Sequence, residues 1–373
     1  MKITIDLRSL SSGSISGVEN YTINTVEGLL ALDKKNEYSL FYNAFDTGLS
    51  VDYHYINSRL VRTKIPNKIL NIAFKLGLVN LEKFVGNTDW VFMPNLNQFS
   101  LMPSTRLALT VHDISPVVAP EFYNLKRRTW HWFLNYKKAF DRANLIFAVS
   151  EYTKQDIITQ FGIRENKIKV VHPGLDTEIY KPQIKEQALR ELRNLLNLPP
   201  EFFLFLNTIE PRKNLENLLK AFEMLSGPEY LVIAGRKGWK NKRIFSLIEK
   251  SKRRKKIILL GYVQEDQKPA LIKMSKALVY PSFYEGFGFQ PVEAMALGVP
   301  VIASQVTALP EVVGDAGVLV NPYNPLDIAR AMKGIVEEKS LAEELVLKGL
   351  ERAGVFGREK SAKKILDYLE NYV

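Results

Sequence analysis

Short apolar runs recur along the chain, and they alternate with stretches whose apolar positions have helical spacing. This alternation predicts a doubly wound α/β architecture. Two sets of about six parallel strands predict two similar sheets packed face to face. In the first half the predicted strands are Lys2–Leu7, Tyr38–Tyr42, Trp90–Met93, Leu107–Val111, Leu145–Val149 and Ile168–Val171. In the second half they are Phe203–Asn207, Tyr230–Ala234, Ile257–Leu260, Ala277–Tyr280, Val299–Ala303 and Gly317–Val320.

A domain break is predicted at His172–Asp176, where a proline and a glycine follow the last strand of the first half. A polar, lysine-rich segment with three prolines comes next. The break separates a first domain, residues 1–173, from a second that begins at residue 174.

Composition narrows the function classes. The 373 residues are 46% apolar and 24% charged, values typical of a soluble globular protein of two domains. No apolar run approaches the length of a membrane span, and the first six residues are expected to start a strand rather than a signal peptide. The lack of cysteine excludes disulfides, and the four histidines are not spaced as zinc ligands. The net charge of +11 favours an anionic partner, either nucleotide phosphates, an acidic membrane face or nucleic acid.

Two glutamates eight positions apart, Glu285 and Glu293, dominate the second half. A glycine-rich turn separates them, Pro291 suits the first position of a helix, and Gly298 suits its end. Glu285 is therefore expected in a loop and Glu293 in the first helical turn.

The turn between the glutamates has the features of an anion site. A helix N-terminus and the free amides of Gly286, Phe287, Gly288 and Phe289 would lie at the carboxyl edge of a parallel sheet. A carboxylate would repel a phosphate unless it is aimed at another group, and its two oxygens can accept both protons of a vicinal diol. The pattern therefore predicts a site for a sugar nucleotide.

Arg212 and Lys213 stand between a predicted strand and the helical pattern Leu215–Leu225. Two cations at the start of a helix suit a diphosphate, because Arg grips two oxygens and Lys adds a movable charge. Taken alone, such a pair is more often a solvated basic turn. The glutamate site in a second strand–loop–helix unit reverses this preference and favours the functional interpretation.

His112 directly follows a predicted strand, with Asp113 beside it. A histidine in such a place is more often a hydrogen-bonded structural residue. Here, however, it would lie at the carboxyl edge of the first sheet, across a cleft from the predicted sugar-nucleotide site.

The small residues around Gly13 and Gly17 would let a loop approach a ligand closely. Neither Gly13-x-x-x-Gly17 nor Gly286-x-Gly288 is a dinucleotide fingerprint, which disfavours a nicotinamide enzyme.

Three basic stretches remain, at Lys64–Leu76, Lys126–Arg142 and Lys250–Lys256. The first two mix cations with aliphatic or aromatic residues, which suits a membrane surface, although ordinary amphipathic helices have the same pattern. The third is expected to be a solvated helix end, and none of the three is a recognisable nucleic-acid module.

Taken together, these residues resemble those of the retaining glycosyltransferases of family 4, the group 1 glycosyltransferases, which have the GT-B fold of two Rossmann-like domains facing across a cleft. The resemblance covers nearly the whole chain, and the two glutamates in their EGFG…EAMA setting are its most specific part. The matching segments are the Gly17–Tyr21 loop, Val111–Asp113, Val149–Lys154, Glu210–Asn214, Ile233–Trp239, Gly261–Val263, Glu285–Gly298 and Pro310–Gly317.

The resemblance implies a role for each site residue. Glu293 would hold the ribose hydroxyls and Glu285 the donor sugar, while Arg212 and Lys213 would neutralise the leaving diphosphate with help from the amides of Gly286–Phe289. His112 would contact the sugar from the opposite domain, the Gly17 loop would close near the phosphate, and Gly235 and Val263 would lie against the base. No covalent nucleophile, cofactor or metal is expected, because cations take the place of an Asp-x-Asp metal site.

The likeness further implies a second domain of residues 174–355 and a C-terminal helix, within 356–373, that returns to the first domain. The sequences of Thr208–Asn214 and Ile233–Trp239 resemble those of mannosyl- and rhamnosyltransferases that build surface polysaccharides, so GDP-mannose is the expected donor. We expect a glycan or lipid-linked acceptor and a cytoplasmic location, with a possible peripheral contact with an anionic membrane. We expect no nucleic-acid partner.

The sequence departs from the family pattern at several positions, and alternative functions remain open. Asn207, Gln290 and Val355–Arg358 differ from what relatives often carry, which leaves a phosphate contact at Asn207 open. The rival functions are a GT-B sugar-nucleotide epimerase, which would need more acid/base groups, and a basic nucleic-acid-binding protein. A pyridoxal-dependent phosphorylase fits less well, since no lysine has a convincing cofactor setting.

Overall fold

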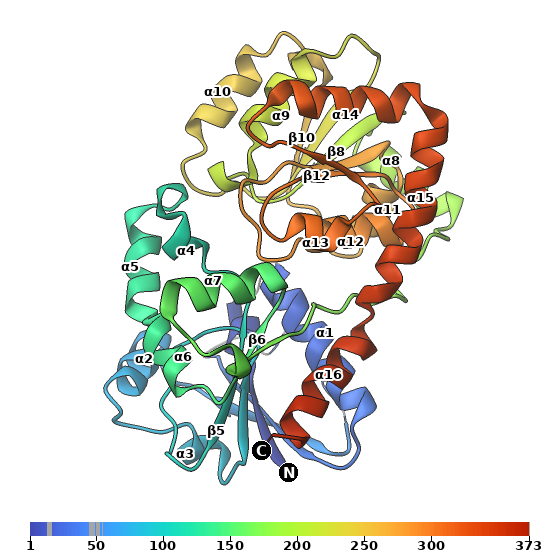
Figure 1. Cartoon of the computed structure of the whole chain (residues 1–373). Coiled ribbons are helices and arrows are strands. Elements are labelled where there is room, and N and C mark those ends of the chain that lie inside the picture. Colours follow the sequence, from blue (N-terminus) through green and yellow to red (C-terminus); the bar gives the residue numbers. More distant parts are fainter. Residues whose placement is uncertain (13–16, 45–48, 50–52, 54, 373) are drawn as a thin grey trace. The chain divides into compact units, whose positions relative to one another are not determined.

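A computed structural model describes residues 1–12, 17–44, 49, 53 and 55–372 of the chain. The chain divides into two compact units (Figure 1). Unit 1 comprises Met1–Ile114, Arg128–Gly174 and Gly357–Val373, and unit 2 comprises Ser115–Arg127 and Leu175–Phe356. Residues Ser115–Arg127 lie within the predicted first domain but group with unit 2, and we call them the strap.

The described strands of unit 1 form one parallel sheet in the order β3-β2-β1-β4-β5-β6-β7. The strands are β1 Lys2–Asp6, β2 Glu37–Asn43, β3 Ser58–Thr63, β4 Trp90–Met93, β5 Arg106–Val111, β6 Leu145–Ala148 and β7 Ile168–Val170. The six predicted strands of this half are confirmed, and β3 was missed. It is an edge strand without a buried residue, and its two arginines interrupt the apolar run on which the prediction rested.

Helices cover the sheet of unit 1, and the last of them comes from the C-terminus. They are α1 Gly17–Leu32, α2 Asn67–Lys75, α3 Glu82–Val85, α5 Leu125–Leu134, α6 Tyr136–Arg142, α7 Glu151–Phe161 and α16 Arg358–Glu370, with short 3-10 turns η1 Arg8–Ser12 and η3 Glu165–Lys167. Helix α16 lies beside α1 (Figure 1), and a Cβ on Gly28 would lie 2.8 Å from Cβ of Ala362. Ile365 and Leu369 of α16 belong to the same buried cluster as β1, β2 and β4.

The described strands of unit 2 form a second parallel sheet in the order β10-β9-β8-β11-β12-β13. They are β8 Phe202–Leu206, β9 Tyr230–Ala234, β10 Ile257–Gly261, β11 Ala277–Tyr280, β12 Val301–Ser304 and β13 Val318–Val320. All of them were predicted. Strands β8 and β11 are buried at every residue, as expected for parallel strands covered on both faces.

The helices of unit 2 are α4 Ser115–Val118, α8 Glu186–Leu195, α9 Leu215–Glu223, α10 Lys242–Lys250, α11 Lys268–Lys273, α12 Phe289–Ala296, α13 Leu309–Val313, α14 Pro325–Glu337 and α15 Lys339–Ala353. The 3-10 turns are η2 Pro120–Phe122, η4 Pro211–Lys213, η5 Arg254–Lys256 and η6 Gly354–Phe356. The chain leaves the centre of this sheet in opposite directions from β8 and β11. Their carboxyl ends therefore form the switch point at which open α/β sheets bind ligands.

Helix α12 differs from its prediction at one end. It begins at Phe289, so Pro291 is its third residue, and Glu293 is its fifth rather than a first-turn residue. A proline is tolerated here because the first amides of a helix have no intrahelical acceptor. Gly288, at φ +105°, forms the N-cap, and Gly298, at φ +65°, follows the end of the helix as predicted.

Candidate active site

Two loops meet at the switch point of unit 2, one after β8 and one after β11. The amide of Phe283 donates to the carbonyl of Arg212 at 2.9 Å. The buried side-chain amide of Asn214 donates to the carbonyls of Pro281, at 2.8 Å, and Pro322, at 2.7 Å. These bonds fix the basic turn against the loop that carries Glu285.

Glu285 pairs with both predicted phosphate cations. Its Oε1 lies 2.6 Å from Nζ of Lys213, and its Oε2 lies 3.0 Å from a terminal nitrogen of Arg212. The guanidinium of Arg212 also pairs with Glu210 at 3.1 Å. The site is thus a buried cluster of two cations and two carboxylates. We did not predict the role of Glu210, although it stands in the quoted motif and is separated from Arg212 by one residue.

The charges of this cluster shift one another's protonation. Burial alone would raise the pKa of Glu285, but the charges of Lys213 and Arg212 outweigh it and lower this pKa from 4.5 to about 2. Burial raises the pKa of Glu210, against the opposing charges of Arg212 and Lys213. Burial, and then the charge of Arg212, lowers the pKa of Lys213. Glu285 is therefore a carboxylate at neutral pH.

Glu293 lies on α12 and has a partner that the sequence did not reveal. Nζ of Lys268 is 3.2 Å from Oε1 of Glu293 and 2.9 Å from Glu265. Although Glu293 is buried, its Oε2 makes no hydrogen bond among the described residues. The buried Tyr180 is near enough for the charge of Glu293 to add to burial in raising the pKa of this tyrosine. Lys268 begins the short helix α11, whose first five residues are buried, and no motif marked it.

Gly235 and Val263 follow the neighbouring strands β9 and β10. A Cβ on Gly235, at φ +144°, would lie 1.8 Å from the carbonyl oxygen of Asn207, so the two loops approach as closely as a glycine allows. Val263 is buried. The stretch Gly286–Phe289 runs from Glu285 into α12, and the ring of Phe287 packs on Phe289 and Phe356.

The predicted residues of the first half lie in unit 1. Nε2 of His112 is 2.8 Å from the carbonyl oxygen of Pro94, and its ring packs edge-on against Tyr21. Because a carbonyl only accepts, Nε2 carries the hydrogen, and burial lowers the pKa of His112, so the ring is neutral at pH 7. Gly17 is the first residue of α1. The part of its loop at residues 13–16 lies outside the described residues.

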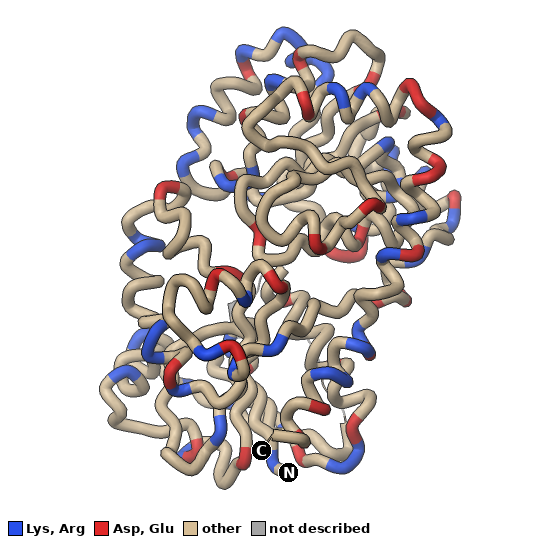
Figure 2. Tube along the Cα trace, viewed as in Figure 1, with Lys and Arg blue, Asp and Glu red and all other residues tan. Residues whose placement is uncertain are grey.

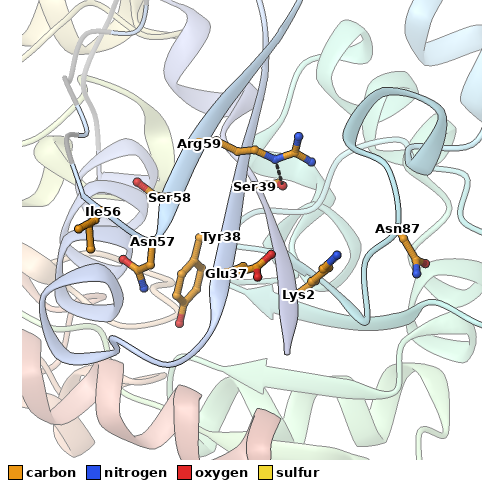
Figure 3. A pocket seen from close by; sticks show the side chains of 9 residues that line it. All are labelled: Lys2, Glu37, Tyr38, Ser39, Ile56, Asn57, Ser58, Arg59 and Asn87. Atoms are coloured by element: carbon orange, nitrogen blue, oxygen red, sulfur yellow. Dashed lines mark hydrogen bonds between the residues drawn. The ribbon is translucent and has the colours of Figure 1, made fainter.

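Two cavities of unit 1 lie away from these residues. One is lined by the first residues of β1, β2 and β3, including Lys2, Glu37 and Ser58 (Figure 3). The other is lined by the first residues of β6 and β7, with Arg142 and Lys167. Both are at the amino ends of strands, the edge opposite to the one at which such sheets bind ligands.

The basic run Lys250–Lys256 has a structural use. The guanidinium of Arg253 donates to the carbonyls of Phe222, Leu225, Gly227 and Glu229, and Nζ of Lys256 donates to that of Pro228. The run therefore closes the turn before β9. Lys and Arg are spread over both units rather than gathered in one stripe (Figure 2).

Within the described part of the chain, no three His, Asp or Glu side chains gather as metal ligands. None of the described helices combines the length and the apolar character that crossing a bilayer requires.

Two family models match the chain. The one described as Glycosyltransferase Family 4 matches residues 15–179, and the one described as Glycosyl transferases group 1 matches residues 190–352. The chain is 34% identical over 266 residues to O-antigen chain mannosyltransferase B of Escherichia coli, covering 70% of this chain and 69% of that protein. It is 30% identical over 257 residues to the serotype-specific mannosyltransferase WbdA of Escherichia coli. That match covers 67% of this chain but only 32% of the relative, so the chain spans about a third of it.

Among solved structures, sucrose-phosphate synthase from Thermosynechococcus elongatus matches with a TM-score of 0.78 at 20% identity, over 99% of this chain and 98% of that one. The fold is GT-B, as predicted. The chain belongs to the family 4, group 1 glycosyltransferases.

Proposed function

We propose that this glycosyltransferase moves a mannosyl residue from GDP-mannose to a glycan or lipid-linked acceptor of a surface polysaccharide, with retention of the anomeric configuration. The observation that carries the proposal is the buried cluster in which Lys213 and Arg212 hold Glu285 at 2.6 and 3.0 Å. The mannosyltransferases among its relatives support the choice of sugar.

The roles follow from charge and burial. Breaking the anomeric C–O bond places negative charge on the diphosphate, which Arg212, Lys213 and the amides of Gly286–Phe289 would stabilise. Glu285 would accept hydrogen bonds from sugar hydroxyls. The unpartnered Oε2 of Glu293 would accept from the ribose, with Gly235 and Val263 beside the base.

In unit 1, the neutral His112 would offer Nδ1 to a sugar hydroxyl, and the Gly17 loop would close near the phosphate. The reaction would proceed without a covalent intermediate, and an oxygen of the donor phosphate would take the acceptor's proton on the same face. The cations would supply the charge that a metal ion supplies elsewhere, and no cofactor would be needed.

A thermal-shift screen tests the donor. GDP-mannose is expected to raise the melting temperature more than UDP, ADP or dTDP sugars, and Glu293→Ala to abolish the shift. NMR of the product reports the anomeric configuration, and EDTA is expected to leave the rate unchanged. The proposal fails if no nucleotide sugar stabilises the protein, while turnover of the donor sugar without an acceptor would favour an epimerase.

We also propose that unit 1 contacts an anionic membrane from the cytoplasmic side through α2 and α5. Ile69 and Ile72 of α2, with Leu76 directly after its end, form an exposed stripe separate from the buried Leu70 and Phe74. On α5, the ring of Trp132 is 81% exposed. Nζ of Lys75 lies 3.6 Å from the ring centre of Phe133, so the end of α2 abuts α5.

The charge of this surface suits lipid headgroups. Residues 64–80 and 128–140 contain Lys64, Lys68, Lys75, Arg128, Lys137 and Lys138, and no Asp or Glu. Aliphatic side chains ringed by cations and aromatics favour a bilayer surface over RNA, whose phosphates offer no apolar contact.

Vesicle co-sedimentation tests the surface. The wild-type protein is expected to bind vesicles that contain 30% phosphatidylglycerol and not vesicles of pure phosphatidylcholine. The double variant Leu76→Ala, Trp132→Ala is expected to bind the anionic vesicles with about ten times lower affinity. Tyr323→Ala with Leu347→Ala, two residues of similar exposure in unit 2, is the matched control. Equal binding by both double variants excludes this surface.

A further inference from the structure

The strap follows directly on the strand end that carries His112. The chain leaves unit 1 after Ile114, runs through α4 and η2 against unit 2, and rejoins unit 1 at Arg128. No role for the strap follows from the donor contacts described above.

One set of strap contacts grips the loop after β9. Nε1 of Trp239 donates to the carbonyl of Phe122 at 2.6 Å, and the ring of Tyr123 stacks on the indole with centroids 5.7 Å apart. The guanidinium of Arg127 lies 3.9 Å from the indole centre, and Nζ of Lys240 donates to the carbonyl of Glu121 at 2.7 Å. The indole of Trp239 is therefore held by hydrogen bonding, stacking and charge together.

The loop after β9, which carries Trp239, lies against the turn that carries Arg212 and Lys213. The amide of Gly238 donates to the carbonyl of Ile209 at 3.0 Å, and the amide of Ile209 donates to that of Arg236 at 2.9 Å. A Cβ on Gly238 would lie 2.9 Å from the carbonyl oxygen of Ile209 and 3.2 Å from Cβ of Glu210. A displacement of Trp239 would thus reach Glu210 and Arg212 through backbone contacts.

A second strap contact reaches the loop that carries Glu285. The ring of Phe122 stacks on Phe283, with centroids 5.7 Å apart and planes 5° apart. The amide of Phe283 donates to the carbonyl of Arg212, and Glu285 follows two residues later. The strap therefore contacts the loop that carries Glu285 directly, and it reaches the turn that carries Arg212 and Lys213 through the loop after β9.

We infer that the strap positions the donor site, with Trp239 and Phe122 as the positioning residues that set the loops bearing Arg212 and Glu285. Neither residue belongs to the cluster formed by Glu210, Arg212, Lys213 and Glu285. The expected effect of the strap on turnover rests on the proposed function. Its expected effect on the order of the two loops does not depend on that function. Consistent with it, the charge of Arg127 is among those that act on Glu210 and oppose the rise of its pKa.

Hydrogen–deuterium exchange of the protein without ligand tests the inference independently of any donor. In Trp239→Ala, the amides of residues 209–213 and 281–285 are expected to exchange at least about tenfold faster, with the strands of both sheets unchanged. Trp239→Phe keeps a ring for stacking and is expected to restore most of the protection. Unchanged exchange in these loops overturns the inference.

Kinetics then measure the consequence. Trp239→Ala and the milder Phe122→Leu are expected to raise the donor KM and the Kd of the nucleoside diphosphate about tenfold, with Trp239→Phe within threefold of wild type. Tyr368→Ala, which removes a half-buried ring from α16 of unit 1, is the matched control and should change the melting temperature alone. KM, kcat and Kd within twofold of wild type in both folded strap variants contradict the inference. If the wild-type protein binds no nucleoside diphosphate, the proposed function fails, and the exchange result still decides the role of the strap.

Discussion

At the scale of single residues, the contacts of Glu285 change how the site has to work. The buried Lys213, the largely buried Arg212 and two buried carboxylates balance one another before any ligand binds. A buried ion pair gains little net stability, because desolvation offsets the attraction. A diphosphate would bring further negative charge next to Glu285 and compete with it for Lys213 and Arg212.

Replacing Glu285 by Gln separates these effects. Without the carboxylate, Lys213 and Arg212 lose a competing anion, so nucleoside diphosphate is expected to bind equally or up to about tenfold more tightly. Turnover is expected to fall by about a hundredfold or more, since a contact to the sugar is lost. Calorimetric titration and initial rates measure the two effects.

Glu293→Gln is the matched control, because it keeps the same shape at the other glutamate. It is expected to weaken nucleotide binding, since its Oε2 is the proposed ribose acceptor. Weaker diphosphate binding by Glu285→Gln would show that Glu285 orders the cations rather than competing with the ligand.

The lowered pKa of Glu285 predicts a dependence of stability on pH. The pKa falls from 4.5 to about 2 on folding, which corresponds to about 3 kcal/mol of stability at neutral pH. Because the folded pKa is the lower one, this stability is present above about pH 4.5 and is lost as the pH falls towards 2. The raised pKa of Glu210 acts in the opposite direction and reduces the net slope.

Urea unfolding of wild type and Glu285→Gln at pH 7, 5, 4 and 3 isolates the contribution of Glu285. The difference between their free energies of unfolding is expected to shrink below about pH 4.5. A difference that stays constant down to pH 3 would contradict the lowered pKa.

At the scale of elements, the sequence predicted the strands well for a physical reason. Parallel strands covered on both faces are continuous apolar runs, whereas β3 is an edge strand whose apolar residues are flanked by Arg59 and Arg62. The start of α12 was misplaced because Gly288 caps the helix three residues before Pro291. The pairing of Glu285 with Lys213, 72 positions away, is set by tertiary contact and has no local signal.

The contact between the loops after β8 and β9 gives a prediction at this scale. Gly235→Ala would place a methyl group 1.8 Å from the carbonyl oxygen of Asn207 at a φ of +144°. It is expected to destabilise unit 2 by at least about 2 kcal/mol and to weaken nucleotide binding. Gly354→Ala is the control, since a Cβ there meets no atom within 4 Å and φ is −60°. It should be neutral or stabilise by about 0.5 kcal/mol. A thermal melt compares the two, and equal melting temperatures would contradict the close approach.

At the scale of the whole molecule, each unit is built from segments distant in the sequence. Unit 1 takes α16, and unit 2 takes the strap. The return of a C-terminal helix was expected from family resemblance, whereas the strap was not expected, because its contacts come from separate rings that no periodicity connects.

A chain ending at Phe356 tests what α16 contributes to unit 1. Ala362, Ile365 and Leu369 are buried, and burial of the last two alone contributes about 3 to 6 kcal/mol. The shortened chain is expected to lose protease resistance in residues 1–114, while residues 175–356 stay resistant. The charge-preserving control keeps α16 and replaces the exposed Lys363 and Lys364 by Arg. Equal resistance of unit 1 with and without the helix would contradict the contribution.

The return of α16 to α1 has a consequence for synthesis on the ribosome. Strands β1 to β7 are all made before residue 171, yet their core lacks Ile365 and Leu369 until nearly the last residues of α16 leave the exit tunnel. The sheet of unit 2 is complete once β13 has emerged, which is before α16 has emerged. The strap that belongs to unit 2 has emerged earlier still. We therefore expect the order of folding to invert the order of translation, with the first half of the chain waiting for helix α16.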